Sequence, residues 1–141
     1  MEPVLDVHVL TRDAVSLDAG PAGSVLMIPF GGTVSGRIFQ GIVEPCGVDT
    51  QVVNTAGVRH MSARYMLTGK ALPPYEERDC HIYVENNGWF TGDVRMPFRT
   101  TPTFITDHPG LAAYLRNAFV GVGSWEADGL HIRFYEADTQ P

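Results

Sequence analysis

The sequence predicts an all-β fold, an antiparallel barrel or sandwich with one short helix in its C-terminal half. Short runs rich in apolar and β-branched residues recur along the chain, and Gly and Pro separate them. The long run 33–45 contains Gly36 and Gly41, and glycines inside a strand are typical of a sheet that bends or curls. Helical spacing of apolar residues occurs in one segment, after Asp107.

The expected elements follow a simple order. Strands are predicted at 4–10, 24–30, 33–45, 47–54, 57–69, 80–90, 96–106, 120–123 and 130–137. Gly31 and Gly32 predict a turn after the second strand, because glycine adopts positive φ without steric cost. Asp107 is the expected N-cap of the helix and Pro109 fits its first turn. We therefore expect one domain, residues 1–141, that is long enough to bury a core.

Composition excludes several classes of partner. The net charge of -6 argues against binding to nucleic acid and to anionic membrane surfaces, since both favour basic proteins. The chain contains no apolar stretch near the roughly 20 residues of a membrane span and no signal-like N-terminus, so a cytoplasmic location is expected. Cys46 and Cys80 are far apart and form no redox or metal motif.

Strong catalytic and cofactor motifs are absent from the sequence. It contains no phosphate-binding loop, no glycine-rich dinucleotide turn, no nucleophile elbow and no zinc-binding helix. The five histidines, at positions 8, 60, 81, 108 and 131, show no ligand pairing at short spacing. We expect no cofactor and no metal, although a metal assembled across strands, as in cupin-like barrels, stays open as an alternative.

The stretch "RHMSARYML" (59–67) alternates between mostly apolar and mostly polar residues, which indicates a strand with one face on a core. If Thr55-Ala56 forms a two-residue hairpin loop, Asp49 pairs with Ser62. One face of the hairpin would then carry Asp49, Gln51, Val53, His60, Ser62 and Arg64. The other face would carry Met61, Ala63, Tyr65 and Leu67.

This pairing places Asp49 within reach of Arg64 and His60. An arginine keeps a neighbouring aspartate ionised and can bind a carboxylate or an enolate, and a histidine can move protons near neutral pH. The alternative is a solvated outer face with a structural ion pair. Two further candidates are Arg99, in the proline-rich run "FRTTPTF", and Trp89, which either packs or roofs a pocket.

Several short motifs occur in an order that resembles a known family. They are "GGTVSGRIFQGIVEPCGVDTQ", "ARYML", "IYVENNG", "FRTTPTF" and "DGLHIRFYEA". Together they resemble the domain of unknown function 3237 family, from about Ser24 to Ala137. The resemblance implies a calycin-like antiparallel β-barrel, related in architecture to the lipocalins. Calycin relatives include ligand carriers and small cofactor-free cyclases and isomerases.

The resemblance also bears on individual residues. The family pattern matches at Asp49, at Arg64-Tyr65 and at the run Arg99 to Pro102, whereas relatives commonly carry an aspartate where this chain has Ser62. Asp49 would be the base or an orienting group, Arg64 would stabilise an oxyanion, and His60 or Tyr65 would shuttle a proton. The expected substrate-binding residues are Arg99, Ser62, Gln51 and Trp89.

The resulting hypothesis is a cofactor-free enzyme of specialised metabolism. It would isomerise, cyclise or dehydrate a polyketide-like or aromatic small molecule by acid/base chemistry in the barrel cavity. Two alternatives from other classes remain: a non-catalytic carrier that uses the same barrel, and a structural subunit whose barrel is filled with side chains. The expected partner is a small molecule, and the chain is also expected to pair as a homodimer.

Overall fold

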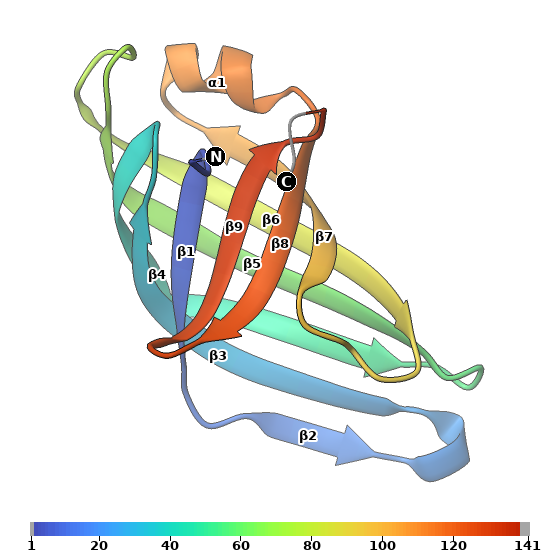
Figure 1. The fold of residues 1–141 in the computed structure, drawn as a ribbon. Coiled ribbons are helices and arrows are strands. Elements are labelled where there is room, and N and C mark those ends of the chain that lie inside the picture. Colours follow the sequence, from blue (N-terminus) through green and yellow to red (C-terminus); the bar gives the residue numbers. More distant parts are fainter. Residues whose placement is uncertain (1, 139–141) are drawn as a thin grey trace.

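The structure of the protein is a computed structural model that describes residues 2–138. Eight antiparallel strands close into a barrel, and one short helix, α1, lies over one end (Figure 1). The strands follow the order β1-β9-β8-β7-β6-β5-β4-β3, and pairing between β1 and β3 closes the circle. A further strand, β2, pairs with β3 beside the point where β1 leaves it. The all-β antiparallel prediction is confirmed.

The bounds of the elements show long strands on one side of the barrel. The strands are β1 Leu5–Thr11, β2 Val15–Asp18, β3 Ser24–Ser35, β4 Phe39–Val53, β5 Val58–Ala71, β6 Asp79–Thr91, β7 Phe98–Thr106, β8 Phe119–Glu126 and β9 Gly129–Glu136, and the helix is α1 Pro109–Leu115. The long strands β3 to β6 reach past the others at the end of the barrel opposite α1 (Figure 1).

One predicted turn is wrong. Gly31 and Gly32 lie inside β3, and the chain reverses at residues 36–38 instead. Gly32 has a φ of +137°, and a Cβ there would lie 1.9 Å from the carbonyl oxygen of His8. The glycine therefore permits the close approach of β1 that closes the barrel, rather than a turn.

The helix has a different cap from the one expected. His108 is the N-cap, because its Nδ1 accepts a hydrogen bond from the backbone N–H of Leu111 at 3.3 Å. Asp107 instead accepts hydrogen bonds from the backbone N–H and the imidazole of His81, at 2.8 and 2.9 Å. Pro109 occupies the first turn as predicted.

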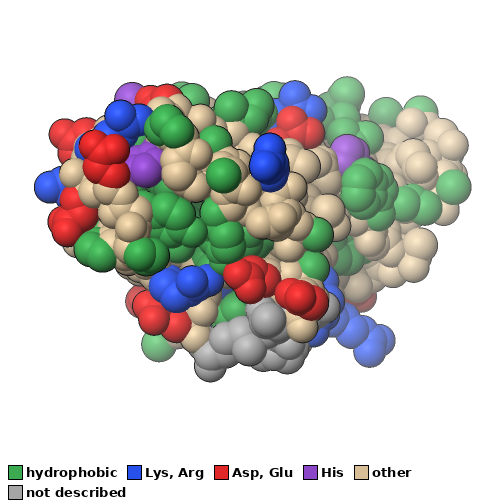
Figure 2. All heavy atoms as spheres, turned by 90° about the horizontal axis from the view of Figure 1, so that it is seen from above, with side chains coloured by type: hydrophobic (Ala, Val, Ile, Leu, Met, Phe, Trp, Pro, Cys, Tyr) green, Lys and Arg blue, Asp and Glu red, His purple; other side chains and the backbone are tan. Residues whose placement is uncertain are grey.

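The helix end of the barrel is filled with apolar side chains. Leu111 and Leu115 of α1 are buried against inward-facing residues such as Leu67, Ile82 and Phe134, which have no exposed surface. Figure 2, which looks onto this end, shows hydrophobic side chains near the middle of the molecule with acidic and basic side chains around them. Among the described residues, no helix is long and apolar enough to span a membrane.

The hairpin between β4 and β5 corrects the predicted register by one residue. Its loop comprises three residues, 55–57, because Gly57 adopts the left-handed φ of +79° that such loops commonly use. Asp49 therefore pairs with Ala63 and not with Ser62. A shift of one residue moves every side chain of a strand to the opposite face of the sheet.

Candidate functional site: a half-empty barrel

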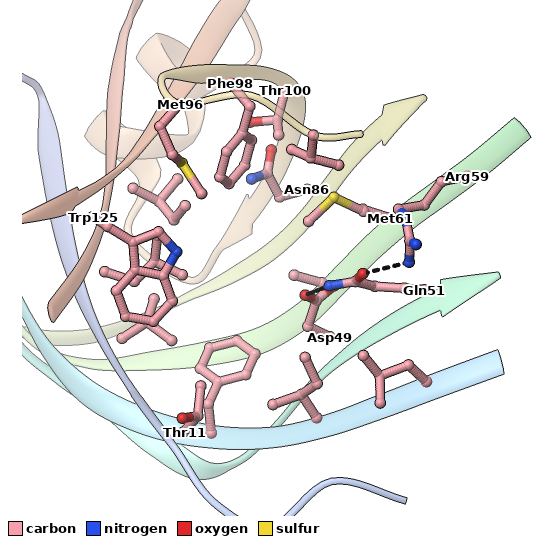
Figure 3. A pocket seen from close by; sticks show the side chains of 18 of the residues that line it. Thr11, Asp49, Gln51, Arg59, Met61, Asn86, Met96, Phe98, Thr100 and Trp125 are labelled. Atoms are coloured by element: carbon pink, nitrogen blue, oxygen red, sulfur yellow. Dashed lines mark hydrogen bonds between the residues drawn. The ribbon is translucent and has the colours of Figure 1, made fainter. Parts of the chain in front are cut away.

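The end of the barrel opposite α1 contains a cavity of about 450 Å³ (Figure 3). This volume lies within the range of small-molecule sites, roughly 300–1,000 Å³. Apolar side chains form most of its wall, and they come from every strand of the barrel except β4 and β6, which contribute polar residues. They include Val9, Leu26, Ile28, Phe30, Met61, Phe98, Trp125 and Leu130.

The polar groups of the cavity begin with Asp49 on β4. Its Oδ2 accepts a hydrogen bond from Nε2 of Gln51 at 2.9 Å, and Oε1 of Gln51 accepts one from Nη1 of Arg59 at 3.0 Å (Figure 3). These three residues all face inward, with Arg59 at the start of β5. Gln51 is thereby held as a fixed donor, which leaves the second carboxylate oxygen of Asp49 for another partner.

Burial controls the acidity of Asp49. Removal from water raises the pKa of its carboxyl group, while the hydrogen bond from Gln51 and the charge of Arg59 act in the opposite direction. The net result is a raised pKa. A carboxylate in such an environment is a stronger base than one in water.

Four polar atoms in the cavity wall are buried and have no hydrogen-bond partner among the described residues. They are Oδ1 of Asp49, the hydroxyl of Tyr65, Oδ1 of Asn86 and the hydroxyl of Thr100. An unsatisfied buried polar group costs about 1–3 kcal/mol, so these four atoms are the points of the wall at which water or a bound molecule would form hydrogen bonds. Burial, and after it the charge of Asp49, raises the pKa of Tyr65, so its hydroxyl stays protonated.

The structure divides the residues proposed from the sequence into two groups. Asp49, Gln51 and Tyr65 line the cavity together. The other five proposed residues, His60, Ser62, Arg64, Trp89 and Arg99, lie on positions that alternate with cavity-lining residues and face the outside of the barrel. The prediction that His60, Ser62 and Arg64 line the cavity while Met61, Ala63 and Tyr65 pack elsewhere is therefore wrong, because the hairpin loop is one residue longer than assumed.

The outward residues form their own contacts. The imidazole of His60 stacks on Trp89, with ring centroids 4.7 Å apart, and its Nε2 lies 3.0 Å from Oδ1 of Asn87. Arg64 is 63% exposed and pairs with Glu85 at 3.8 Å across the strands. This face thus carries an exposed ion pair, as in the alternative that the sequence left open, but the partner of Arg64 is Glu85 and not Asp49. Ser62 on the same face is buried, and its hydroxyl has no partner among the described residues.

Five polar residues of the cavity were not expected from the sequence: Thr11, Arg59, Asn86, Asp93 and Thr100. Arg59 lies on the same face of β5 as Met61 and Tyr65, which a two-residue hairpin loop would have turned away from Asp49. Gly57 was the signal for the correct register, since a glycine at the end of a hairpin loop favours a loop of three residues over one of two. Asn86 lies on β6, which pairs with β5, and Thr100 lies on β7, which pairs with β6 and β8. Which face of these strands points inward depends on that pairing, and no local pattern reveals it.

One cluster on the outer wall has the composition of a metal site. The ligand atoms of His8, Asp128 and His131 lie within 4.8 Å of one another. Nδ1 of His131 lies 2.8 Å from the carboxylate of Asp6, and Nε2 lies 2.8 Å from that of Asp128. Both ring nitrogens thus donate to carboxylates and have no lone pair for a metal, so the cluster is better described as an ion-pair network.

Solved structures of other proteins share this barrel. A protein of unknown function from Clostridium acetobutylicum superimposes with a TM-score of 0.74 and 29% identity, covering 94% of this chain and 95% of that one. A β-barrel-like protein from Acinetobacter baumannii has a TM-score of 0.68 at 22% identity, covering 95% and 92%. An enzyme from Penicillium herquei has a TM-score of 0.66 at 14% identity, covering 95% and 92%. The last two likenesses show the fold alone.

Sequence comparisons agree with the structural ones. A UPF0311 protein of Clostridium acetobutylicum is 32% identical, and the match covers 74% of this chain and 72% of the relative. A UPF0311 protein of Rhodopseudomonas palustris is 28% identical over 96% of this chain and 99% of the relative. The model of the family described as "Protein of unknown function (DUF3237)" matches residues 1–137. The chain therefore belongs to the DUF3237 family.

Proposed function

We propose that the protein is an enzyme that moves protons on a small, largely apolar cyclic molecule held in the barrel cavity, with Asp49 as the base. The observation that carries this proposal is the buried Oδ1 of Asp49, which has no partner among residues 2–138 and belongs to a group that lines an apolar cavity. A protein needs a strong reason to retain a poorly solvated carboxyl group, and proton transfer supplies one.

The neighbours of Asp49 suit this chemistry. Gln51 holds one carboxylate oxygen in place, so the other can accept a proton from a C–H or O–H group of the substrate. The protonated hydroxyl of Tyr65 can donate a hydrogen bond to the negative charge that develops on a carbonyl oxygen. Isomerisation, cyclisation and dehydration of a polyketide-like or aromatic compound all begin with such a step.

The comparisons add modest support. The structure from Penicillium herquei, which shares the fold, is described as that of an enzyme. The relatives at higher identity are described as proteins of unknown function, so they do not choose between an enzyme and a carrier. The choice depends on Asp49.

A generic carbon acid tests the base directly. 5-Nitrobenzisoxazole is a small aromatic compound that loses its C3 proton to a base while its N–O bond breaks, and the product, 2-cyano-4-nitrophenolate, absorbs visible light. We expect the protein to accelerate this elimination well beyond acetate at equal concentration, because the apolar cavity desolvates the carboxylate. Asp49→Asn should lower the rate constant by about 100-fold or more.

Glu85→Gln is the matched control, because it makes the same carboxylate-to-amide change on the outer face of the neighbouring wall. Its rate should equal that of the unchanged protein. A rate that survives Asp49→Asn, or a protein no faster than acetate, would reject the enzyme proposal in favour of a carrier, provided that the probe still binds.

A further inference from the structure

We infer that the molecule bound in this cavity is a flat, mostly apolar ring system with hydroxyl groups at two opposite ends, one bound by Asp49 and the other by Asn86. This inference deepens the proposed function, because it names the chemical class that the same cavity selects. It rests on the register of three neighbouring strands and on the two acceptor atoms that they place in the wall.

Asp49, Ala63 and Asn86 form one row across β4, β5 and β6. Asp49 pairs with Ala63, and Ala63 pairs with Asn86. Neighbouring strands lie about 4.8 Å apart, so the Cα atoms of Asp49 and Asn86 are separated by about 10 Å. The methyl group of Ala63 leaves the space between the two polar side chains open, and a flat ring can lie over it.

The two ends of the row require hydrogen-bond donors. Oδ1 of Asp49 and Oδ1 of Asn86 are both acceptors, both are buried, and neither has a partner in the described part of the chain. Asn86 is only 5% exposed. The hydroxyl of Thr100 lies on the same side of the cavity as Asn86, so a ligand hydroxyl there can donate to one residue and accept from the other (Figure 3).

The surroundings of the row favour an uncharged ring over a charged or flexible chain. Below it, towards the filled half, Phe30 and Tyr65 meet edge to face with centroids 5.1 Å apart. Above it, Met61 lines the cavity. Arg59 is already hydrogen-bonded to Gln51, and Asp49 disfavours an anionic group at its own end.

Three matched probes test this inference by binding alone, measured by isothermal titration calorimetry. 2,6-Dihydroxynaphthalene carries hydroxyls at opposite ends, 2,3-dihydroxynaphthalene carries the same two groups side by side, and 2-naphthol carries one. We expect the 2,6-isomer to bind about 5- to 10-fold more tightly than the other two, the value of one additional buried hydrogen bond. The other two should bind with similar affinity.

Two variants locate the second hydroxyl. Asn86→Leu should reduce the affinity for the 2,6-isomer to that for 2-naphthol and leave 2-naphthol itself nearly unchanged. Asn87→Leu, a matched change on the outer face of the same strand, should affect none of the probes. Ala63→Leu should weaken all three, because its side chain would occupy the space over the row. If Asn86→Leu fails to fold, the affinities of the unchanged protein for the 2,6- and 2,3-isomers still test whether the cavity selects hydroxyls at opposite ends.

Equal binding of the two dihydroxy isomers, or no binding of any probe at millimolar concentration, would overturn the inference. Its failure is separable from failure of the proposed function. If the 2,6-isomer binds selectively but 5-nitrobenzisoxazole is not eliminated, the inference about the ligand stands and the protein is a carrier for this class of molecule. If elimination occurs without selectivity between the isomers, the proposed function stands and the substrate belongs to another chemical class. In Asp49→Asn the amide oxygen faces the fixed donor of Gln51, so the amide NH2 faces the ligand and can donate to its hydroxyl. This variant should abolish proton transfer while keeping the preference for the 2,6-isomer over 2-naphthol, because that preference depends on Asn86.

Discussion

The half of the barrel under α1 and the half that opens at the opposite end share the same eight strands but differ inside. In the first half, Leu67, Ile82 and Phe134 meet in a dry core with no exposed surface. In the second half, the same strands present Asp49, Asn86 and apolar side chains such as Met61 and Ala63 to a cavity. A single closed sheet can therefore use one half for stability and the other for binding.

The outside of the wall around the cavity carries a network of charged side chains. On the outer face of β1 and β9, His131 lies between the carboxylates of Asp6 and Asp128, and Arg133 binds Asp6 with Nε at 3.0 Å. His8 stacks on His131 at 4.8 Å. This network connects β1 and β9, and the inner faces of both strands line the cavity. The comparison thus predicts different responses of the two halves to substitution and to pH.

The largest difference should appear between two inward residues of β5. Leu67→Ala removes packing from the filled half and should lower the free energy of unfolding by about 2–5 kcal/mol. Met61→Ala, six residues earlier, enlarges a cavity that already exists and should cost about 1 kcal/mol or less. Urea unfolding monitored by circular dichroism measures both. Equal losses for the two variants would mean that the halves do not differ in packing.

A smaller effect should appear in the pH dependence of stability. Burial lowers the pKa of His131, but hydrogen bonds to Asp6 and Asp128 and the charges of these groups outweigh it, so the net pKa is raised. A raised pKa in the folded state stabilises the protein fully below the unfolded value of about 6.5, and this contribution is lost as the pH rises through the folded pKa. The urea concentration at the midpoint of unfolding should therefore decrease as the pH is raised from weakly acidic to weakly alkaline values.

His131→Gln should remove most of this decrease in stability with rising pH. His81→Gln is the control, because His81 is an exposed histidine that pairs with Asp107 at the filled end, and it should leave the decrease in place. A stability curve that is flat in the unchanged protein, or that falls equally in His131→Gln, would show that the outer network does not hold the open half.

The smallest effects concern the two arginines of β5 that the register separates. Arg64→Met should change stability by only about 0–1 kcal/mol, because its pair with Glu85 is exposed, and should leave the elimination of 5-nitrobenzisoxazole unaltered. Arg59→Met removes a charge that lowers the pKa of Asp49, so the pH at which half of the activity is lost should move upward. A shift in Arg64→Met, with none in Arg59→Met, would restore the originally predicted register.

Much of the fold was predictable from local pattern. The alternation within residues 59–67 and the helical spacing of apolar residues after Asp107 both predicted the observed type of element. Gly32 was misread as part of a turn. A glycine needed for a turn and a glycine needed for close approach of another strand look the same in a sequence, and here the neighbour, His8, is 24 residues away.

The candidate site was predictable in part. Of the residues that the sequence predicts for it, Asp49, Gln51 and Tyr65 line the cavity, whereas His60, Ser62 and Arg64 face outward. The division follows from one decision about the length of a hairpin loop. Because side chains alternate along a strand, an error of one residue exchanges the two faces completely.

The sequence by itself determined that the chain forms an antiparallel all-β fold, a barrel or a sandwich, with one helix, because period-two patterns, glycines and prolines act over a few residues. Only the tertiary structure decided which face of each strand looks inward, where the interior stays empty, and that Asp49 and Asn86 share a row although they are 37 residues apart. The physical reason is that pairing between strands is a long-range property. Local patterns define the faces of a strand, and the register of its neighbours decides which of them meets the cavity.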